Sequence, residues 1–208
     1  DMESTFSKAA RGESLDNFKF SKSDCCNISF LQGYFYRDRI SGSDDKLVHK
    51  PDIIKSAKVI KKLMAKYDIS SYVVDREQEG KQQVTKIYIT EPESLHTLYN
   101  LFGNNIKCEK CMVNFLTGVF VSDGILVNPE KGYHLEFTYK DEFLAKNLLN
   151  TLKFSGFDFK LSKRKASYAV YTKNSQTIEE FLVTVGAQTS CLELMGDKMI
   201  KDIRNHQN

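Results

Sequence analysis

Cysteine is the residue type in this 208-residue chain that most directly allows chemistry, because a thiolate can bind a metal, form a disulfide or act as a nucleophile. There are five of them. Cys25 and Cys26 are adjacent, Cys108 and Cys111 form a CxxC pair, and Cys191 stands alone. An odd number of cysteines does not fit the disulfide framework of a small secreted protein. We therefore expect free thiols, and the fold must decide whether the first four act together.

Lysine and arginine are the second group, since their cations bind phosphate. The net charge of +3 is too small to indicate a nucleic-acid partner, so the distribution of charge has to decide. Five cations fall on one expected hairpin, with only Asp158 opposing them: Lys160, Lys163, Arg164, Lys165 and Lys173. Three more lie on the equivalent hairpin of the first half: Arg76, Lys81 and Lys86. The lysines between residues 55 and 66 have a simpler interpretation, the solvated outer face of a helix.

The sequence contains none of the common motifs for nucleotide binding or nucleophilic catalysis. It contains no GxxxxGK[ST] phosphate loop, no GxGxxG after a strand and no GxSxG turn, and its four histidines show no ligand spacing. No apolar run approaches the ~20 residues that span a bilayer. The first residues lack the apolar core of a secretory signal. We expect a cytoplasmic protein with no membrane partner, and its hydrophobic content of 41% indicates a folded chain.

The elements that must position these residues are organised by an internal repeat. Residues 25–38 (CCNISFLQGYFYRD) match residues 110–123 (KCMVNFLTGVFVSD) at six of fourteen positions, without a gap and at an offset of 85 residues. The matched pairs include Cys26 with Cys111, and Asp38 with Asp123. A duplication is the economical explanation.

In the first half, apolar residues at spacings of three and four predict a helix within 51–68. Residues 69–77 and 83–90 are rich in β-branched residues and predict two strands around a turn. A short helix, 93–102, is expected to end at Gly103.

The second half follows the same order. Residues 132–139 alternate as a strand, and 141–154 form a helix that Gly156 closes. Residues 157–165 and 166–173 form the basic hairpin, and 177–187 form a closing helix. Each half therefore has the order helix, strands, helix, two strands, helix, which predicts an α+β fold.

The repeated segments resemble the LAGLIDADG signature of homing endonucleases. LTGVFVSDG, from Leu116 to Gly124, and LQGYFYRDR, from Leu31 to Arg39, both follow the nine-letter pattern. A glycine inside a helix costs ~1 kcal/mol relative to alanine, which indicates a close helix contact. The resemblance implies one pseudo-twofold monomer whose signature helices meet through Leu31, Gly33, Leu116 and Gly118.

Nearly the whole chain, most strongly from residue 108 onward, resembles the WhiA family of sporulation and cell-division transcription regulators. NPEKGYHLEF, at 128–137, is the most specific string, and YAVYTKNSQTIEEFL and VGAQTSCLEL support it. Members of this family normally carry a C-terminal helix-turn-helix module. This chain stops about where that module should begin, so we expect it to be a piece of a longer protein.

Asp38 and Asp123 close the two signatures and leave two interpretations open. In homing endonucleases these acids hold a divalent metal, so Mg²⁺-dependent cleavage of DNA is one alternative. The other is that both are polar residues at helix ends, since Asp-Gly at 123–124 is a common turn. Typical WhiA sequences lack acids here, and Arg39 replaces the closing glycine of the first copy, where its cation would compete with a metal. We expect vestigial positions, with no catalytic residue, no metal and no cofactor.

The same packing would bring Cys25, Cys26, Cys108 and Cys111 near the N-termini of the two helices. Four thiolates there would make a tetrahedral zinc site. Adjacent residues of a helix point about 100° apart, however, which makes Cys25 and Cys26 an awkward pair of ligands. We therefore expect small buried hydrophobes at a helix interface, with zinc as the alternative.

The resemblance places the two hairpins on sheets that lie along the DNA major groove, so their eight cations are the predicted DNA contacts. We expect a non-enzymatic DNA-binding regulator, which works with DNA and with other transcription or cell-division regulators. The alternatives are an endonuclease using Asp38 and Asp123, and a protein-interaction or ligand-sensing module. The expected divisions are 1–104 and 105–188 for the two repeats and 189–208 for a C-terminal helix.

Overall fold

The computed structural model describes residues 5–39, 45–103 and 108–207, and they form two compact units. One unit contains residues 19–122, and the other contains residues 1–18 and 123–208. These units do not coincide with the two repeats, because nearly all of the second signature helix belongs to the unit of the first. The expected repeat boundary at 104–105 lies outside the described residues, and the division into repeats stays a prediction.

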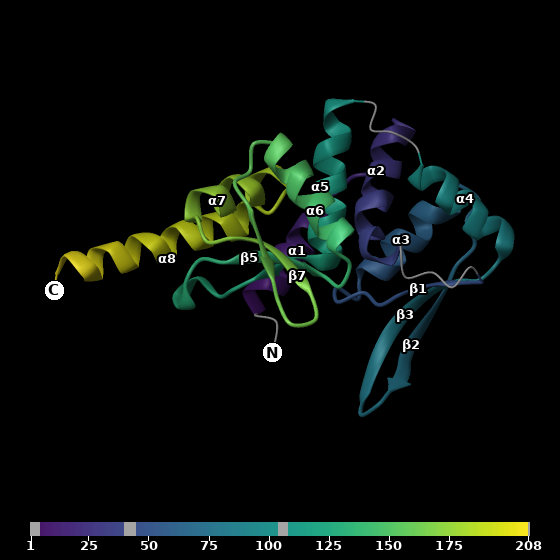
Figure 1. The fold of residues 1–208 in the computed structure, drawn as a ribbon, viewed down its shortest axis with the longest axis horizontal. Helices are drawn as coiled ribbons and strands as arrows, with labels where there is room; N and C mark the ends of the chain where they lie inside the picture. The colour runs from purple at the N-terminus through teal and green to yellow at the C-terminus, as the bar shows by residue number, and fades with distance from the viewer. Residues whose placement is uncertain (1–4, 40–44, 104–107, 208) are drawn as a thin grey trace. The chain divides into compact units, whose positions relative to one another are not determined.

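The unit of residues 19–122 contains helices and a three-stranded antiparallel sheet in the order β1-β3-β2. Its elements, in chain order, are α2 (Asp24–Tyr34), the 3-10 helix η1 (Tyr36–Arg39), β1 (Leu47–His49), α3 (Ser56–Ala65), β2 (Tyr72–Glu79), β3 (Gln82–Ile89), α4 (Pro92–Phe102) and α5 (Glu109–Asp123), of which Asp123 belongs to the other unit. Figure 1 shows the β2–β3 hairpin extending beyond the helices of this unit.

The hairpin is bent where its register shifts. Tyr72 lies opposite Tyr88 and Glu79 opposite Gln82, with an irregularity between Val74 and Glu77. Arg76 sits at this bulge with a φ of +59°, a left-handed conformation that is uncommon for a residue other than glycine. The sequence predicted both strands, and it missed the bulge that separates the base of the hairpin from its tip.

α3 shows why the first predicted helix forms. Its buried residues include Ala57, Ile60, Leu63 and Met64, at the spacings of one helical face. The lysines of this region are exposed, as expected for a solvated outer face: Lys55, Lys58, Lys61, Lys62 and Lys66. The helix is shorter than the predicted range because residues 51–55 precede its first turn.

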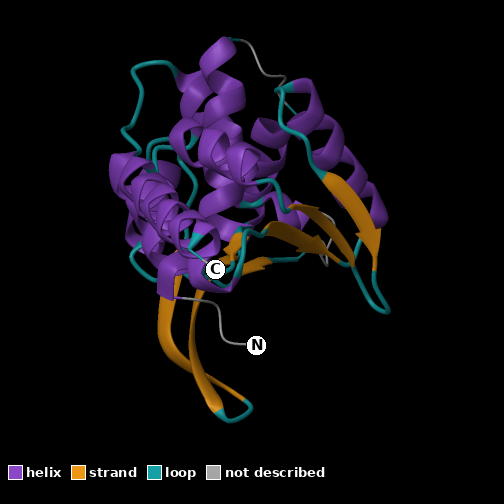
Figure 2. Ribbon diagram, turned by 90° about the vertical axis from the view of Figure 1, so that its left-hand side faces the viewer, coloured by secondary structure: helices purple, strands orange, loops and turns teal. Residues whose placement is uncertain are grey.

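The unit of residues 1–18 and 123–208 contains a four-stranded antiparallel sheet in the order β4-β5-β7-β6. Its elements are α1 (Thr5–Asn17), β4 (Ile125–Leu126), the 3-10 helix η2 (Pro129–Lys131), β5 (Leu135–Tyr139), α6 (Glu142–Phe154), β6 (Lys160–Lys163), β7 (Tyr168–Thr172), α7 (Ser175–Thr184) and α8 (Gln188–His206). Strands and helices are separated by colour in Figure 2.

Side-chain caps fix the starts of two of these helices. The carboxylate of Asp141 accepts hydrogen bonds from the backbone N–H groups of Phe143 and Leu144, and Asn174 accepts one from Thr177. Glu13 of α1 accepts hydrogen bonds from the N–H groups of Thr189 and Ser190 at the start of α8. α1 is therefore tied to the last helix of the chain.

The repeat order is confirmed. After α2 the first half continues with a strand, a helix, two strands and a helix, and after α5 the second half continues with two strands, a helix, two strands and a helix. α1 and α8 lie outside this pattern. Among the described helices, none combines the length and the apolar character required to cross a membrane.

Candidate nucleic-acid interface

The two signature helices touch backbone to backbone within the unit of residues 19–122. A Cβ atom placed on Gly33 would lie 2.0 Å from the carbonyl oxygen of Phe115, and one on Gly118 would lie 2.3 Å from that of Phe30. Leu31 and Leu116 are fully buried beside them. The predicted interface is confirmed, and its reason is steric, because the approach leaves no room for a side chain at either glycine.

Asp38, which closes the first signature, lies in η1 rather than in the signature helix. Its carboxylate Oδ2 lies 2.6 Å from Nδ1 of His49, and both side chains are largely buried. The His49 ring packs against the rings of Tyr34 and Phe35, with centroids 4.6 Å and 5.4 Å away. The sequence analysis did not single out His49, although its place two residues after Leu47 in a strand puts it on the buried face.

Asp123, which closes the second signature, is the last residue of α5 and is buried. The hydroxyl of Tyr139 donates a hydrogen bond of 2.8 Å to its Oδ2. Tyr139 lies on β5 and is itself buried. Each signature acid therefore contacts one side chain from a strand of its own unit.

Arg39 was expected to compete with a metal for Asp38. In the structure its Nη2 donates to the carbonyl oxygen of Gln32 at 3.2 Å, and its guanidinium lies 4.9 Å from the centre of the Phe102 ring. Burial lowers the pKa of Arg39. Gln32 in turn donates to the carbonyl oxygens of Leu101 and Phe102, so Arg39 helps to hold the end of α4 against α2.

On the hairpin of the 19–122 unit, Lys86 is paired with acids. Its Nζ lies 2.9 Å from Glu77 and 3.6 Å from Glu79, and the hydrogen bond to Glu77 raises the pKa of Lys86. Glu77 also accepts a hydrogen bond from Tyr88, which lowers the pKa of that carboxyl, as does Lys86. Arg76 and Lys81, the other two predicted contacts, are exposed. Residues 72–89 hold three acids and three cations, so this hairpin is balanced in charge, with Arg76 at the bulge and Lys81 in the turn at the tip.

Two tyrosine rings stack on the same hairpin. Tyr72 and Tyr88 lie opposite each other in the register, and their rings stack with centroids 5.0 Å apart at an angle of 8°. Tyr72 is 47% exposed. The stack occupies the face of the sheet opposite to buried His49 and Ile87.

On the hairpin of the other unit, Arg164 reaches across β7 to Glu136 of β5. Its guanidinium nitrogens lie 2.6 Å and 3.2 Å from the two carboxylate oxygens. His134 also contacts Glu136, at 2.8 Å, and its ring stacks on that of Tyr171. Burial alone would raise the pKa of Glu136, but the hydrogen bonds from Arg164 and His134 outweigh burial and lower it. The expectation that only Asp158 opposes this cluster was wrong, because Glu136 is distant in sequence and adjacent in the sheet.

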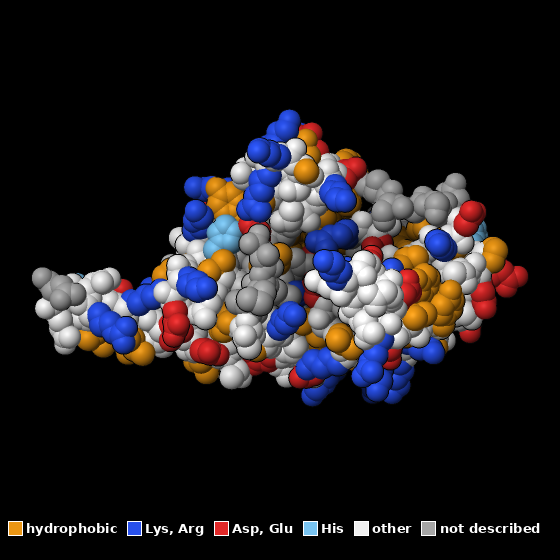
Figure 3. All heavy atoms as spheres, turned by 90° about the horizontal axis from the view of Figure 1, so that it is seen from below, with side chains coloured by type: hydrophobic (Ala, Val, Ile, Leu, Met, Phe, Trp, Pro, Cys, Tyr) orange, Lys and Arg blue, Asp and Glu red, His pale blue; other side chains and the backbone are white. Residues whose placement is uncertain are grey.

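The remaining four cations of that hairpin are exposed. Lys160 shares the face of Glu136 and Tyr171 by the strand register, and Lys163 lies opposite Tyr168 at the other end of β6. Lys165 is in the turn and Lys173 follows β7. On the face drawn in Figure 3, Lys and Arg side chains form groups, with acidic side chains among some of them. Of the eight predicted contacts, seven are exposed, and two, half-buried Lys86 and exposed Arg164, belong to ion pairs.

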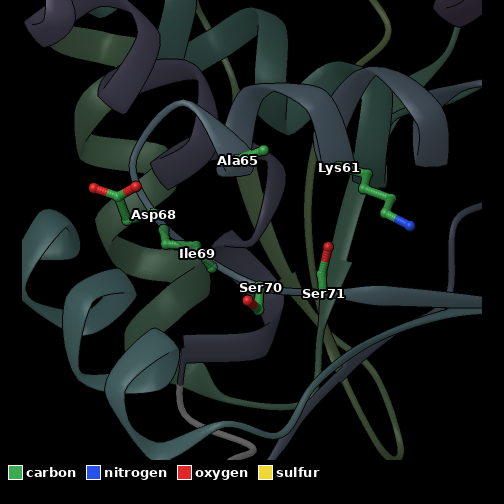
Figure 4. A pocket seen from close by; sticks show the side chains of 6 residues that line it. All are labelled: Lys61, Ala65, Asp68, Ile69, Ser70 and Ser71. Atoms are coloured by element: carbon green, nitrogen blue, oxygen red, sulfur yellow. The ribbon is translucent and has the colours of Figure 1, made fainter.

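A hollow of about 430 Å³ follows the end of α3 and is lined by Lys61, Ala65, Asp68, Ile69, Ser70 and Ser71. Figure 4 shows the charged ends of Lys61 and Asp68 at opposite sides of it, pointing away from each other. These groups do not converge on a common point, so the hollow offers no arrangement for catalysis.

A family model described as the WhiA LAGLIDADG-like domain matches residues 112–204. A probable cell division protein WhiA from Clostridium botulinum (strain Hall) is 35% identical over 135 residues, which is 64% of this chain and 43% of that protein. The protein of the same description from Clostridium novyi (strain NT) is 31% identical over 163 residues, covering 77% of this chain and 50% of that protein. The chain spans about half the length of these relatives.

The crystal structure of the N-terminal LAGLIDADG domain of WhiA is similar to 89% of this chain, with a TM-score of 0.70, 24% identity and 92% of that chain covered. Full-length WhiA from Thermatoga maritima gives a TM-score of 0.74 over 95% of this chain and 67% of that one, also at 24% identity. The homing endonuclease I-DmoI in complex with DNA and Mn gives 0.56 at 15% identity, over 78% of this chain and 97% of that one. The fold is thus LAGLIDADG-like.

Proposed function

Because residues 112–204 match the family model of the WhiA LAGLIDADG-like domain, we propose that the chain is a DNA-binding part of a transcription and cell-division regulator and that it does not cleave DNA. The observation that carries the proposal is the set of six cations on the β2–β3 and β6–β7 hairpins that are exposed and lie outside the ion pairs recorded among the described residues. Two-stranded ribbons fit the major groove, and cations on them contact phosphates. The related fold of I-DmoI has been solved with DNA bound.

The signature acids have a structural role that needs no metal. Asp38 and Asp123 each direct one oxygen to a protein side chain, His49 and Tyr139 respectively. The relatives are named as cell division proteins, not as enzymes.

Fluorescence anisotropy on a random DNA duplex tests binding. The affinity should fall steeply with salt, because each neutralised phosphate releases counterions. Replacing Lys160 and Lys163 by Glu should weaken binding at least tenfold at low salt. Lys61 and Lys62, exposed on α3, give a matched control with the same change of charge, and their replacement should have a much smaller effect. Equal losses in both variants would mean that net charge, not the hairpin, drives association.

Incubation of supercoiled DNA with the protein and Mg²⁺ or Mn²⁺ tests the absence of cleavage. The DNA should remain intact. Nicking that disappears on replacing Asp123 by Asn would establish the endonuclease alternative instead.

One observation favours a second candidate, a protein-interaction module. The later part of α8 exposes apolar side chains at helical spacing, among them Leu192, Met195, Met199 and Ile203. Such a stripe is typical of a face that another protein covers. Replacing Met199 and Ile203 by Gln should leave DNA binding unchanged and abolish any self-association seen by analytical ultracentrifugation, if α8 serves this role.

A further inference from the structure

Four cysteines that are far apart in the sequence meet at one end of the signature helix pair. Cys25 and Cys26 occupy the first turn of α2, Cys111 occupies the first turn of α5, and Cys108 precedes that helix directly. Since α2 and α5 pack through Gly33 and Gly118, their N-terminal ends are adjacent. All four cysteines belong to the unit of residues 19–122, and none of them forms a disulfide.

Their sulfur atoms have the spacing of a tetrahedral thiolate site. The four Sγ atoms all lie within 4.8 Å of one another. Cys108 Sγ is 3.3 Å from Cys111, 3.6 Å from Cys26 and 3.8 Å from Cys25. Zinc binds thiolate at about 2.3 Å, so the edges of a regular tetrahedron of sulfurs around it measure about 3.8 Å. The sulfurs are too far apart for a disulfide, whose S–S bond is about 2.05 Å.

Cys25 and Cys26 are adjacent in the sequence, which argues against their binding the same ion. Side chains of neighbouring helical residues diverge by about 100°, which separates two ligands that must reach one ion. In the structure, Cys108 brings the adjacent pair together from the other helix. Its Sγ atom lies within 3.8 Å of the Sγ atoms of both Cys25 and Cys26.

The alternative, that these cysteines are small buried hydrophobes, fits only half of them. Cys26 and Cys111 are buried, but Cys25 is half-buried and Cys108 is exposed. A hydrophobic contact does not explain why two accessible thiols converge on the buried pair.

The cluster lies at the N-terminal ends of two helices, where the helix dipoles stabilise negative charge. The Ser23 hydroxyl lies 3.0 Å from Cys25 Sγ, within reach to donate to a thiolate. The N–H of Cys111 donates to the carbonyl oxygen of Cys108 at 3.0 Å, which closes a tight turn around the CxxC pair.

We propose that Cys25, Cys26, Cys108 and Cys111 bind one Zn²⁺ ion as a closed, structural site that clips the N-terminus of α5 to that of α2. With four protein ligands such an ion has no open position for a substrate. The site is independent of the signature acids and of the DNA-binding hairpins. A polynuclear iron–sulfur cluster spreads its thiolates over several metal atoms and needs a wider cage than this one.

Elemental analysis of the purified chain, kept in reducing buffer and dialysed against metal-free buffer, tests the proposal. We expect one zinc per chain. Replacing zinc by Co²⁺ should give the thiolate-to-metal charge-transfer bands and the intense visible bands of tetrahedral tetrathiolate cobalt. Iron in place of zinc, or no metal above background, would overturn the proposal.

Cys108→Ser is the most informative variant, because Cys108 is exposed and precedes its helix, so the change leaves the buried packing in place. This variant should lose zinc to a chelator that the unaltered chain resists. Cys191→Ser, a change in the other unit, is the matched control and should keep one zinc. Zinc content that is the same in both variants would contradict the assignment of ligands.

A stability measurement separates a structural ion from adventitious zinc. Removal of the metal should lower the Tm of the unaltered chain and of Cys191→Ser, and leave that of Cys108→Ser unchanged, because binding to the folded state alone stabilises it. An unaltered chain whose Tm does not respond to metal removal would mean that the ion, if bound, does not clip the helices.

Discussion

The two signature acids, Asp38 and Asp123, are each paired with a protein side chain, His49 and Tyr139 respectively. Each pair joins a signature acid to a side chain from a nearby strand, at 2.6 Å and 2.8 Å respectively. A buried carboxylate must be satisfied by donors, and protein donors can take the place that metal ions would otherwise fill. The acids can thus persist in the sequence as structural residues.

Tyr139→Phe tests this role for Asp123. The change removes the hydroxyl that donates to the buried carboxylate, and we expect a loss of about 1–3 kcal/mol in the free energy of unfolding. Urea denaturation followed by circular dichroism measures it. Tyr171→Phe is the control, because this half-buried ring stacks on His134 and the change keeps the stack. Comparable losses in both variants would remove the structural explanation for Asp123.

The Glu136 carboxyl should make the stability of the folded chain depend on pH. Its pKa in the folded chain lies below the ordinary value of 4.5, because hydrogen bonds from Arg164 and His134 outweigh burial. A lowered folded-state pKa contributes stability that is present above about pH 4.5 and is lost as the pH falls through the folded-state value. Glu136→Gln should therefore lose less stability than the unaltered chain between neutral pH and the acid range below 4.5. Parallel stability curves for the two chains in urea titrations would show that this carboxyl does not contribute.

At the scale of elements, the contact between α2 and α5 depends on two missing side chains. The backbones approach so closely at Gly33 and Gly118 that any Cβ atom would overlap a carbonyl oxygen. The overlap involves backbone on both helices, so neither side can yield without separating the pair.

Gly33→Ala and Gly118→Ala should each cost more than about 2 kcal/mol of stability, or prevent folding, since the helices must move apart and lose buried contact. Gly196→Ala on α8 is the matched control. Nothing lies within 4 Å of a Cβ placed there, and the change should stabilise the helix by up to about 1 kcal/mol. Thermal unfolding of the three variants provides the comparison, and a mild effect at Gly118 would contradict the close contact.

The periodicity of apolar residues was enough to predict most of the helices and strands. Side chains that are buried when an element packs recur at the period of that element, as Leu135, Phe137 and Tyr139 do on one face of β5. The glycine contact also followed from the repeat and from its resemblance to a known signature. The partners of the charged residues did not follow from the sequence. Glu136 meets Arg164, and His49 meets Asp38, only after strands pair and a sheet packs on a helix.

The contacts among the four clustered cysteines also could not be predicted from local sequence patterns. Their spacing suggested a shared location, but a helical angle of about 100° argued against joint coordination of the adjacent pair. Only the position of Cys108, which lies close to both Cys25 and Cys26, reverses that argument. A residue preceding a helix has no fixed direction that the sequence can supply.

At the scale of the whole molecule, each compact unit contains its own sheet and its own hairpin with exposed cations. The two hairpins differ in charge. Arg76 and Lys81 are the exposed predicted contacts of the β2–β3 hairpin, whereas Lys160, Lys163, Lys165 and Lys173 serve the β6–β7 hairpin. If both sheets bind one duplex, the units contribute unequally to a single electrostatic interaction.

The salt dependence of DNA binding by hairpin variants measures these contributions. The slope of log K against log salt should become shallower by about 0.9 for each phosphate contact removed. Replacing the four lysines of the β6–β7 hairpin by Gln should therefore reduce the slope about twice as much as replacing Arg76 and Lys81. The two sets lie on separate units and share no ion pair that the structure records, so their effects should add in the combined variant. A combined variant no weaker than the lysine variant alone would restrict DNA binding to the unit of residues 1–18 and 123–208, and would leave the other unit to hold the signature helices together.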